Sequence, residues 1–252
     1  MKMTKQNKAN NNINPFPATA VAKLARGSKE LLTIDTPSLK KLRFVIYDYL
    51  VRKDDNGKTI CVIGEYGTGK THLLLEILNI IYGTNDNKLH AFYLDAPSDN
   101  FLELYKRRFI PKLNRNDIIE RLNECFSDVV AAELKEDEIY RELSQKLTNR
   151  EISPDYVIET VGLMESKLQR QFQERLKNIT DDPCFSLALT LFQNPEFEDA
   201  IWAWFCGKEP EKAIRERGIT QIIDTNEMAL EAIGVLAYLF GRQGHRFILL
   251  ID

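Results

Sequence analysis

The residues VIGEYGTGKTHLLLEIL, from Val62 to Leu78, carry more information about the fold than any other part of this chain. Two apolar residues lead into a loop with three glycines, which a lysine, a threonine and a row of leucines follow. The segment from Gly64 to Thr71 fits the pattern G-x-x-x-x-G-K-[ST] at every fixed position. It therefore predicts a phosphate-binding loop between a strand and a helix.

The spacing of this loop follows from the chemistry of phosphate binding. A phosphate chain needs several N–H donors that converge on one point, and Gly67 and Gly69 can adopt backbone angles closed to other residues. The helix that begins near Gly69 adds unpaired N–H groups and the positive end of its dipole. We expect Lys70 to reach the β- and γ-phosphates and to be catalytic, and the Thr71 hydroxyl to bind Mg²⁺.

The predicted nucleotide-binding residues are contiguous in the sequence. They are Gly64, Glu65, Tyr66, Gly67, Thr68, Gly69, Lys70, Thr71 and His72. Because a carboxylate next to phosphate repels it, Glu65 should point away or bind water near the metal. For His72 we expect an amide contact with phosphate and a structural side chain. The alternative for the whole segment is a glycine-rich turn with a chance lysine, but the strand–helix context favours the binding loop.

The stretch RFILLID, from Arg246 to Asp252, is an apolar run closed by one aspartate. A buried strand that ends in a carboxylate can place it beside the water shell of Mg²⁺, so Asp252 is a predicted catalytic residue and magnesium ligand. An ordinary buried strand with a solvated acid is the alternative. Asp95 closes a second apolar run at 89–95 and is a weaker rival, because it can equally be a turn residue or a helix cap.

The order of the expected elements indicates an α/β fold. Residues 36–51 predict an amphipathic helix that Thr36 or Ser38 caps. Residues 58–64 (KTICVIG) read as a buried strand and residues 70–82 as a helix closed by Gly83. With the strand at 89–95, this makes a βαβ unit and a parallel sheet. From about residue 100 to 243 the pattern is helical, prolines mark the joints, and both tryptophans lie in EDAIWAWFCG, which should anchor the helical core.

The composition excludes several classes of protein. A formal net charge of −3 predicts neither a nucleic-acid nor a membrane partner. No apolar run approaches the roughly 20 residues that span a bilayer, and no secretion signal is evident. The four scattered cysteines and three histidines support neither a zinc site nor disulfides, so reduced thiols in a cytoplasmic protein are expected. The basic cluster YKRRF, residues 105–109, could contact DNA phosphates, although a solvated helix face is the simpler reading.

Four segments carry a resemblance to a known family. They are GEYGTGKTHLL, FYLDAPSDNFLELYKRRFI, AIWAWFCGKEPEKAIRERGI and ALEAIGVLAYLFGRQGHRFILLID. Through them the chain resembles the AAA+-like and STAND-like P-loop ATPases. Within these it is most similar to the origin-recognition-type ATPases of bacterial and archaeal defence or mobile elements, such as the ATP-binding proteins of phage-exclusion (BREX) systems.

This resemblance implies ATP binding and Mg²⁺-dependent hydrolysis that drives assembly or movement on a larger partner. Protein partners or self-association, and DNA through the complex, are the expected partners. RFILLID would be the Walker B strand, and the adenine would lie against residues 14–28. In such ATPases a catalytic glutamate and further strands follow Walker B, so we expect these 252 residues to be the front part of a longer protein or a truncated reading frame. The first and last strands would then not be neighbours.

The resulting expectation is a three-layer P-loop NTPase with an incomplete parallel sheet and a large α-helical insertion between the second and Walker B strands. The expected domains are a disordered basic tail at 1–14, the N-terminal part of the NTPase domain at 15–99, a helical insertion at 100–226, and a return helix with the Walker B strand at 227–252. A nucleotide-binding interaction module without turnover and a small-molecule kinase are the alternative functions.

Overall fold

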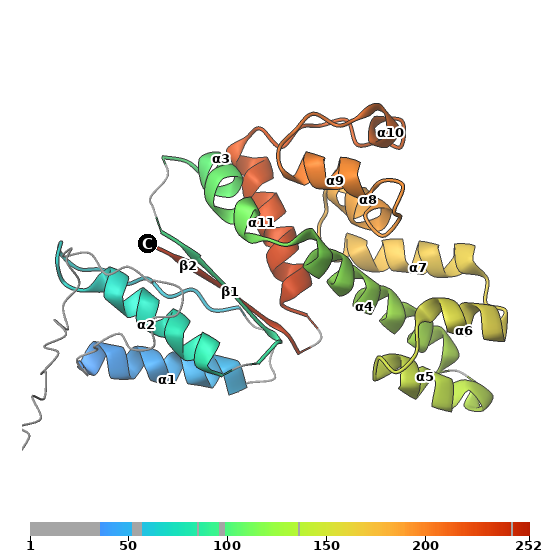
Figure 1. The fold of residues 1–252 in the computed structure, drawn as a ribbon, viewed down its shortest axis with the longest axis horizontal. Coiled ribbons are helices and arrows are strands. Elements are labelled where there is room, and N and C mark those ends of the chain that lie inside the picture. The colour runs from blue at the N-terminus through green and yellow to red at the C-terminus, as the bar shows by residue number, and fades with distance from the viewer. Residues whose placement is uncertain (1–35, 52–56, 85, 96–98, 136, 243) are drawn as a thin grey trace, which may run out of the picture. The chain divides into compact units, whose positions relative to one another are not determined.

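The computed structural model describes residues 36–51, 57–84, 86–95, 99–135, 137–242 and 244–252. The chain divides into two compact units, residues 1–85 and residues 86–252, each of which is described by itself. Figure 1 labels the helices and strands of both units. The predicted tail at 1–14 and the segment at 14–28 that we expected beside the adenine lie outside the described residues.

The first helix of the first unit, α1 (Pro37–Val51), begins where the sequence predicts. The Thr36 hydroxyl oxygen accepts a hydrogen bond from the Leu39 amide at 3.2 Å, which satisfies one of the unpaired donors of the first turn. Three apolar side chains at helical spacing are buried along one face: Leu39, Leu42 and Ile46. The predicted cap and the predicted apolar face are therefore both confirmed.

The second helix, α2 (Lys70–Gly83), buries the apolar side chains Leu75, Ile77, Leu78 and Ile81. An ion pair joins it to α1, because Arg43 Nη2 lies 2.6 Å from the largely buried carboxylate of Glu76. The prediction that Gly83 closes the helix is wrong by one residue. Thr84 ends the helix in an ordinary right-handed conformation, and its amide and hydroxyl both donate to the Ile81 carbonyl.

The predicted strand at 58–64 is wrong. Residues 57–65 form no strand, and Ile60 and Ile63 are 45% and 90% exposed. An apolar run without alternation reads as a buried strand only when neighbouring strands and both faces cover it. The run itself carries no information about whether those neighbours are present.

The sheet belongs to the second unit and has two parallel strands, β1 (Leu89–Leu94) and β2 (Arg246–Ile251). The register runs from Leu89 opposite Arg246 to Leu94 opposite Ile251. Both strands and their parallel pairing confirm the sequence-based expectation. The described residues are mostly helical and form this small parallel sheet, which is compatible with an α/β fold. The three-layer architecture that we expected is not confirmed.

One face of the sheet packs on aromatic side chains. Phe92 of β1 lies 5.3 Å, centroid to centroid, from Phe247 of β2 and 5.8 Å from Phe109. Phe240 of α11 (Asn226–Phe240) completes this cluster at 6.2 Å from Phe92. Edge-on and tilted ring pairs of this kind add to the stabilisation that apolar burial gives.

The helix expected after residue 100 is not uniform. It begins as α3 (Phe101–Glu103), widens into the π-helical turn η1 (Leu104–Phe109), and tightens into the 3₁₀ turn η2 (Ile110–Lys112). The Tyr105 hydroxyl in the π-turn donates to the buried Phe205 carbonyl at 2.6 Å. That long-range hydrogen bond lies at the position where the helix type changes. Because its acceptor is 100 positions away in the chain, the local sequence does not predict it.

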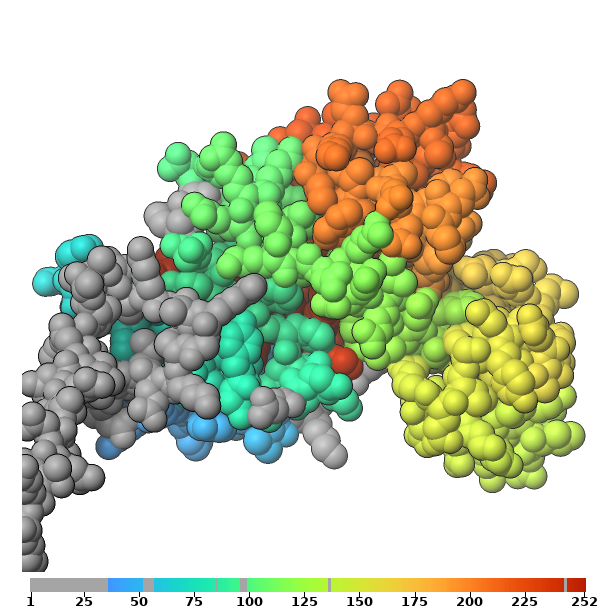
Figure 2. Space-filling view, viewed as in Figure 1, coloured from blue at the N-terminus to red at the C-terminus, as the bar shows by residue number. Residues whose placement is uncertain are grey.

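The remaining helices follow the long helix α4 (Arg115–Leu134), which packs against α5, α6 and α7 among them. Figures 1 and 2 show α4 between the orange helices α8 and α9 and the yellow-green helices α5 and α6. In chain order these elements are η3 (Glu138–Tyr140), α5 (Arg141–Thr148), α6 (Pro154–Val161), α7 (Glu165–Lys177), α8 (Pro183–Leu191), α9 (Glu198–Phe205) and α10 (Lys212–Arg215). Prolines open α6 and α8, as expected for joints between helices.

Trp204 of α9 anchors the helical core, as predicted. Its side chain is fully buried, and its Nε1–H donates to the Gln221 carbonyl at 2.7 Å. The rings of Phe185 and Phe205 lie 5.2 and 5.1 Å from it. The domain boundaries expected after residues 99 and 226 both fall inside this second unit.

None of the helices in the described ranges combines the length and the hydropathy that a bilayer crossing requires. The four cysteines are free thiols, and Cys125 and Cys184 are buried.

Candidate functional site

The glycine loop turns sharply before α2. Gly67 and Gly69 have φ angles of 81° and 85°, in the left-handed region that side-chain-bearing residues avoid. Lys70 is then the first residue of the helix. The two glycines therefore stand where the backbone needs them, as the motif predicts.

Lys70 folds back over this loop. Its Nζ donates to the carbonyl oxygens of Gly64 at 2.8 Å and Glu65 at 2.7 Å. The Thr68 hydroxyl also donates to the Glu65 carbonyl, at 2.8 Å. The loop is thus closed around the ammonium group, which lies on the loop rather than pointing away from it.

The start of α2 has backbone N–H groups beside Lys70. The first backbone hydrogen bond at the start of α2 runs from the Leu73 amide to the Gly69 carbonyl at 2.9 Å, so the amides of Lys70 and Thr71 precede it. Cβ atoms built on Gly67 and Gly69 would meet nothing within 4 Å, which shows that the space beside both glycines is open. Backbone N–H groups at a helix start and a lysine form an anion-binding surface.

The other predicted loop residues differ in their surroundings. Gly64 has a packing role, because a Cβ there would come within 2.8 Å of Thr68 Oγ1. Tyr66 is fully exposed and Glu65 is exposed, so the Glu65 carboxylate does not enter the loop closure. Thr71 and His72 are half-buried in the first turn of α2.

Asp252 lies at the carboxyl edge of the sheet, directly after β2. Its amide donates to the Leu94 carbonyl at 3.0 Å, which extends the ladder by one bond. The Tyr93 hydroxyl donates to Asp252 Oδ2, also at 3.0 Å. Burial, this hydrogen bond and the charge of the carboxylate raise the pKa of Tyr93 well above its ordinary value.

Asp252 and its rival Asp95 each follow the last paired residue of a strand, but the surroundings of their carboxylates differ. Asp95 is exposed, and its Oδ1 lies 3.7 Å from Arg108 Nη1, whose positive charge offsets it. Asp252 is less exposed and faces a neutral donor. Sequence reasoning missed Tyr93 and Arg108. The period of a strand, which places Tyr93 two residues before Asp95 on one face, was the signal available for Tyr93.

A polar cluster occupies the opposite, amino edge of the same sheet. His90 Nε2 lies 2.9 Å from His245 Nδ1, and Arg121 Nη1 lies 2.8 Å from His245 Nε2. Arg121 also donates to the Arg242 carbonyl at 3.0 Å and forms an ion pair with Glu124. Burial, followed by the nearby Arg121 charge, lowers the pKa of each histidine to about 4.

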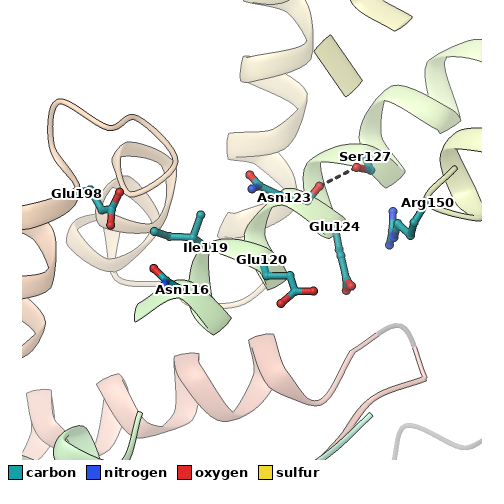
Figure 3. Close-up of a pocket in the computed structure, with 8 residues that line it drawn as sticks. All are labelled: Asn116, Ile119, Glu120, Asn123, Glu124, Ser127, Arg150 and Glu198. Carbon is teal, nitrogen blue, oxygen red and sulfur yellow. Dashed lines mark hydrogen bonds between the residues drawn. The ribbon is translucent and has the colours of Figure 1, made fainter. Parts of the chain in front are cut away.

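A hollow of about 490 Å³ lies along α4 and is the second place where polar groups gather (Figure 3). Its lining consists of Asn116, Ile119, Glu120, Asn123, Glu124, Ser127, Arg150 and Glu198. Three of these are carboxylates and one is a guanidinium, although Glu124 and Glu198 form ion pairs with Arg121 and Arg115. The predicted nucleotide residues do not line it.

Within the described part of the chain, no group of three or more His, Cys, Asp or Glu side chains is placed to hold a metal ion. Mg²⁺ ordinarily takes one or two protein oxygens and completes its shell with phosphates and water, and the Thr71 hydroxyl and Asp252 carboxylate have the required oxygen chemistry. The two residues belong to different compact units. Comparisons with protein-family models, curated proteins and solved structures gave no match.

Proposed function

We propose that this chain is an ATP-binding P-loop NTPase. The observation that carries the proposal is the closure of the loop from Gly64 to Gly69 around Lys70, with two left-handed glycines at the start of a helix. The backbone amides at the start of α2 and the Lys70 ammonium group are adjacent in the chain, and the phosphate chain of a nucleotide requires donors of both kinds.

In the proposed complex, Lys70 exchanges its two carbonyl contacts for the β- and γ-phosphates. The carbonyl oxygens are neutral acceptors, whereas a phosphate oxygen is charged, and charge-assisted hydrogen bonds are the stronger ones. The Thr71 hydroxyl would bind Mg²⁺ at the loop, and the Asp252 carboxylate is proposed as a second magnesium ligand. The ion would neutralise part of the charge on the phosphates. The carbonyl partners of Lys70 support this role because they hold the ammonium group at the loop before nucleotide arrives.

The wider part of the proposal is a cytoplasmic ATPase of the AAA+/STAND-like group, in which hydrolysis drives conformational change or assembly of a macromolecular complex. It is supported by the sequence resemblance and by the parallel pairing of the strands before and after the helical segment. A direct DNA contact by the basic cluster at 105–109 has less support. Arg107 forms an ion pair with Glu103 at 2.9 Å and Arg108 lies near Asp95, so part of the positive charge is offset.

The direct test is ATP binding by the 252-residue chain, measured by isothermal titration calorimetry with Mg²⁺ present. Lys70→Ala should weaken binding by tenfold or more, because a charge-assisted contact contributes about 1.5–3 kcal/mol. Lys41→Ala removes an exposed lysine on α1 and should leave the affinity unchanged. Absence of ATP binding by the wild type, or equal binding by Lys70→Ala, would overturn the proposal.

Turnover is a separate question that the same samples answer. Phosphate release that depends on Lys70 identifies an ATPase. If ATP raises the melting temperature while phosphate release stays at background, the chain binds nucleotide without turnover. Binding at 100 times Kd should stabilise the native state by about 2.7 kcal/mol, which is large enough to detect in a thermal scan.

A further inference from the structure

We propose that Tyr93 is a positioning residue that orients the Asp252 carboxylate at the carboxyl edge of the sheet, so that its second oxygen is free to bind Mg²⁺. This inference rests on the proposed function and extends it to a residue that the P-loop pattern does not include. The register of the two strands and one hydrogen bond between them support this role.

The backbone of Asp252 is fixed by β1. Leu94 and Ile251 are the last paired residues of the register, and the hydrogen bond from the Asp252 amide to the Leu94 carbonyl continues the pairing beyond them. This bond places the Cα of Asp252 at the carboxyl edge of the sheet. It leaves the side-chain torsions of the aspartate undetermined.

Tyr93 determines how that side chain is oriented. Tyr93 pairs with Leu250 in the register, and paired residues share a face of the sheet. Asp252 follows Leu250 by two residues and therefore lies on the same face, as a diagonal neighbour of Tyr93. The tyrosine hydroxyl reaches Oδ2 at 3.0 Å.

The hydrogen bond gives the two carboxylate oxygens of Asp252 different roles. Oδ2 accepts from Tyr93, while Oδ1 keeps its lone pairs for a cation or its water shell. Partners of this kind, which touch a ligand and not the metal, commonly change metal affinity by 10–100-fold when they are removed. Arg108 lies near Asp95, so that second carboxylate has a cationic neighbour of its own.

The test is the magnesium dependence of ATP binding in Tyr93→Phe, which removes only the hydroxyl. The Mg²⁺ concentration that gives half of the full affinity gain should rise about tenfold, while ATP affinity measured in EDTA stays at the wild-type value. Tyr105→Phe is the matched control. It also removes a hydrogen-bonded hydroxyl from the second unit, where the acceptor is the Phe205 carbonyl, and it should leave the magnesium dependence unchanged.

A double-mutant cycle with Asp252→Ala, measured by urea denaturation without nucleotide, gives an independent readout. The Tyr93→Phe and Asp252→Ala effects on stability should be non-additive if the two side chains are in contact. Additive effects, or an unchanged magnesium midpoint in Tyr93→Phe when the wild type binds ATP through Lys70, would overturn this inference alone. A wild-type chain that binds no ATP would instead remove the proposed function, and this inference with it.

Discussion

Arg121 donates from Nη1 to Nε2 of His245 across 2.8 Å, although 124 positions separate the two residues in the chain. A guanidinium has no acceptor, so Nε2 of His245 must be the unprotonated nitrogen of a neutral ring. Nδ1–H of His245 then donates to Nε2 of His90 at 2.9 Å. One arginine therefore fixes the tautomers of both histidines and favours their neutral forms.

Because His90 and His245 are neutral in the native state, we expect the free energy of unfolding to decrease at mildly acid pH. Native pKa values of about 4 lie below the ordinary value of 6.5, so the unfolded chain binds protons first as the pH falls from 6.5 towards 4. The free energy of unfolding should decrease by about 2 kcal/mol between pH 7 and pH 5, allowing for solvent screening. Urea denaturation at the two pH values measures this change.

The control for this pH effect is the double variant His90→Gln, His245→Gln. The charged neighbours of the pair, Arg121, Glu124, Lys88 and Asp86, stay in place in that variant. Its stability should vary much less between pH 7 and pH 5. An equal decrease in both proteins would assign the pH dependence to other groups.

Replacement of the buried guanidinium tests the whole amino-edge cluster. Arg121 has a side chain only 3% exposed, and Arg121→Met leaves Glu124, His245 and the Arg242 carbonyl without it. Breaking a buried ion pair from one side should lower the free energy of unfolding by about 3 kcal/mol. The matched control is Arg107→Met, whose ion pair with Glu103 is exposed and should contribute less than about 0.5 kcal/mol. Similar effects of the two substitutions in urea denaturation would contradict this prediction.

The glycines around α2 should respond to alanine in opposite directions. Gly69→Ala forces a Cβ into a left-handed conformation and should cost about 1–2 kcal/mol, with weaker ATP binding. Gly83→Ala should raise stability by up to about 0.5 kcal/mol, because Gly83 lies within the helix and alanine is the better helix former. Thermal unfolding and calorimetric titration of both variants measure the contrast. Loss of stability in Gly83→Ala would show that α2 does not end as described.

Removal of the Trp204 indole should destabilise the second unit. Trp204→Phe leaves the Gln221 carbonyl without its donor and reduces a fully buried side chain, at a cost of about 2–3 kcal/mol. Trp202→Phe is the control, since Trp202 is only partly buried and stacks on Phe192. Guanidinium denaturation followed by circular dichroism compares the stability of the two variants. A larger loss of stability in Trp202→Phe would show that Trp202, and not Trp204, anchors the helical core.

Local sequence was sufficient for the elements whose cause is local. The cap at Thr36, the left-handed glycines 67 and 69, and the apolar run of β2 are each encoded within a few residues, and the structure has all of them. The parallel pairing of β1 with β2 agrees with the parallel sheet expected from the sequence. That expectation rested on a βαβ unit whose first strand, at 58–64, does not form, so the sequence did not identify which strands pair. The nucleotide, the metal and the family are still predictions.

Tertiary structure alone settled what depends on residues far apart in the chain. The apolar run at 58–64 forms no strand, because a strand needs a hydrogen-bonded neighbour and hydrophobicity does not reveal one. The π-helical turn at 104–109, the bond from Tyr93 to Asp252, and the bond from Arg121 to His245 all involve contacts across 100 or more residues. Backbone preferences act over one or two turns, whereas the choice of a polar partner is made by the packing of the whole unit.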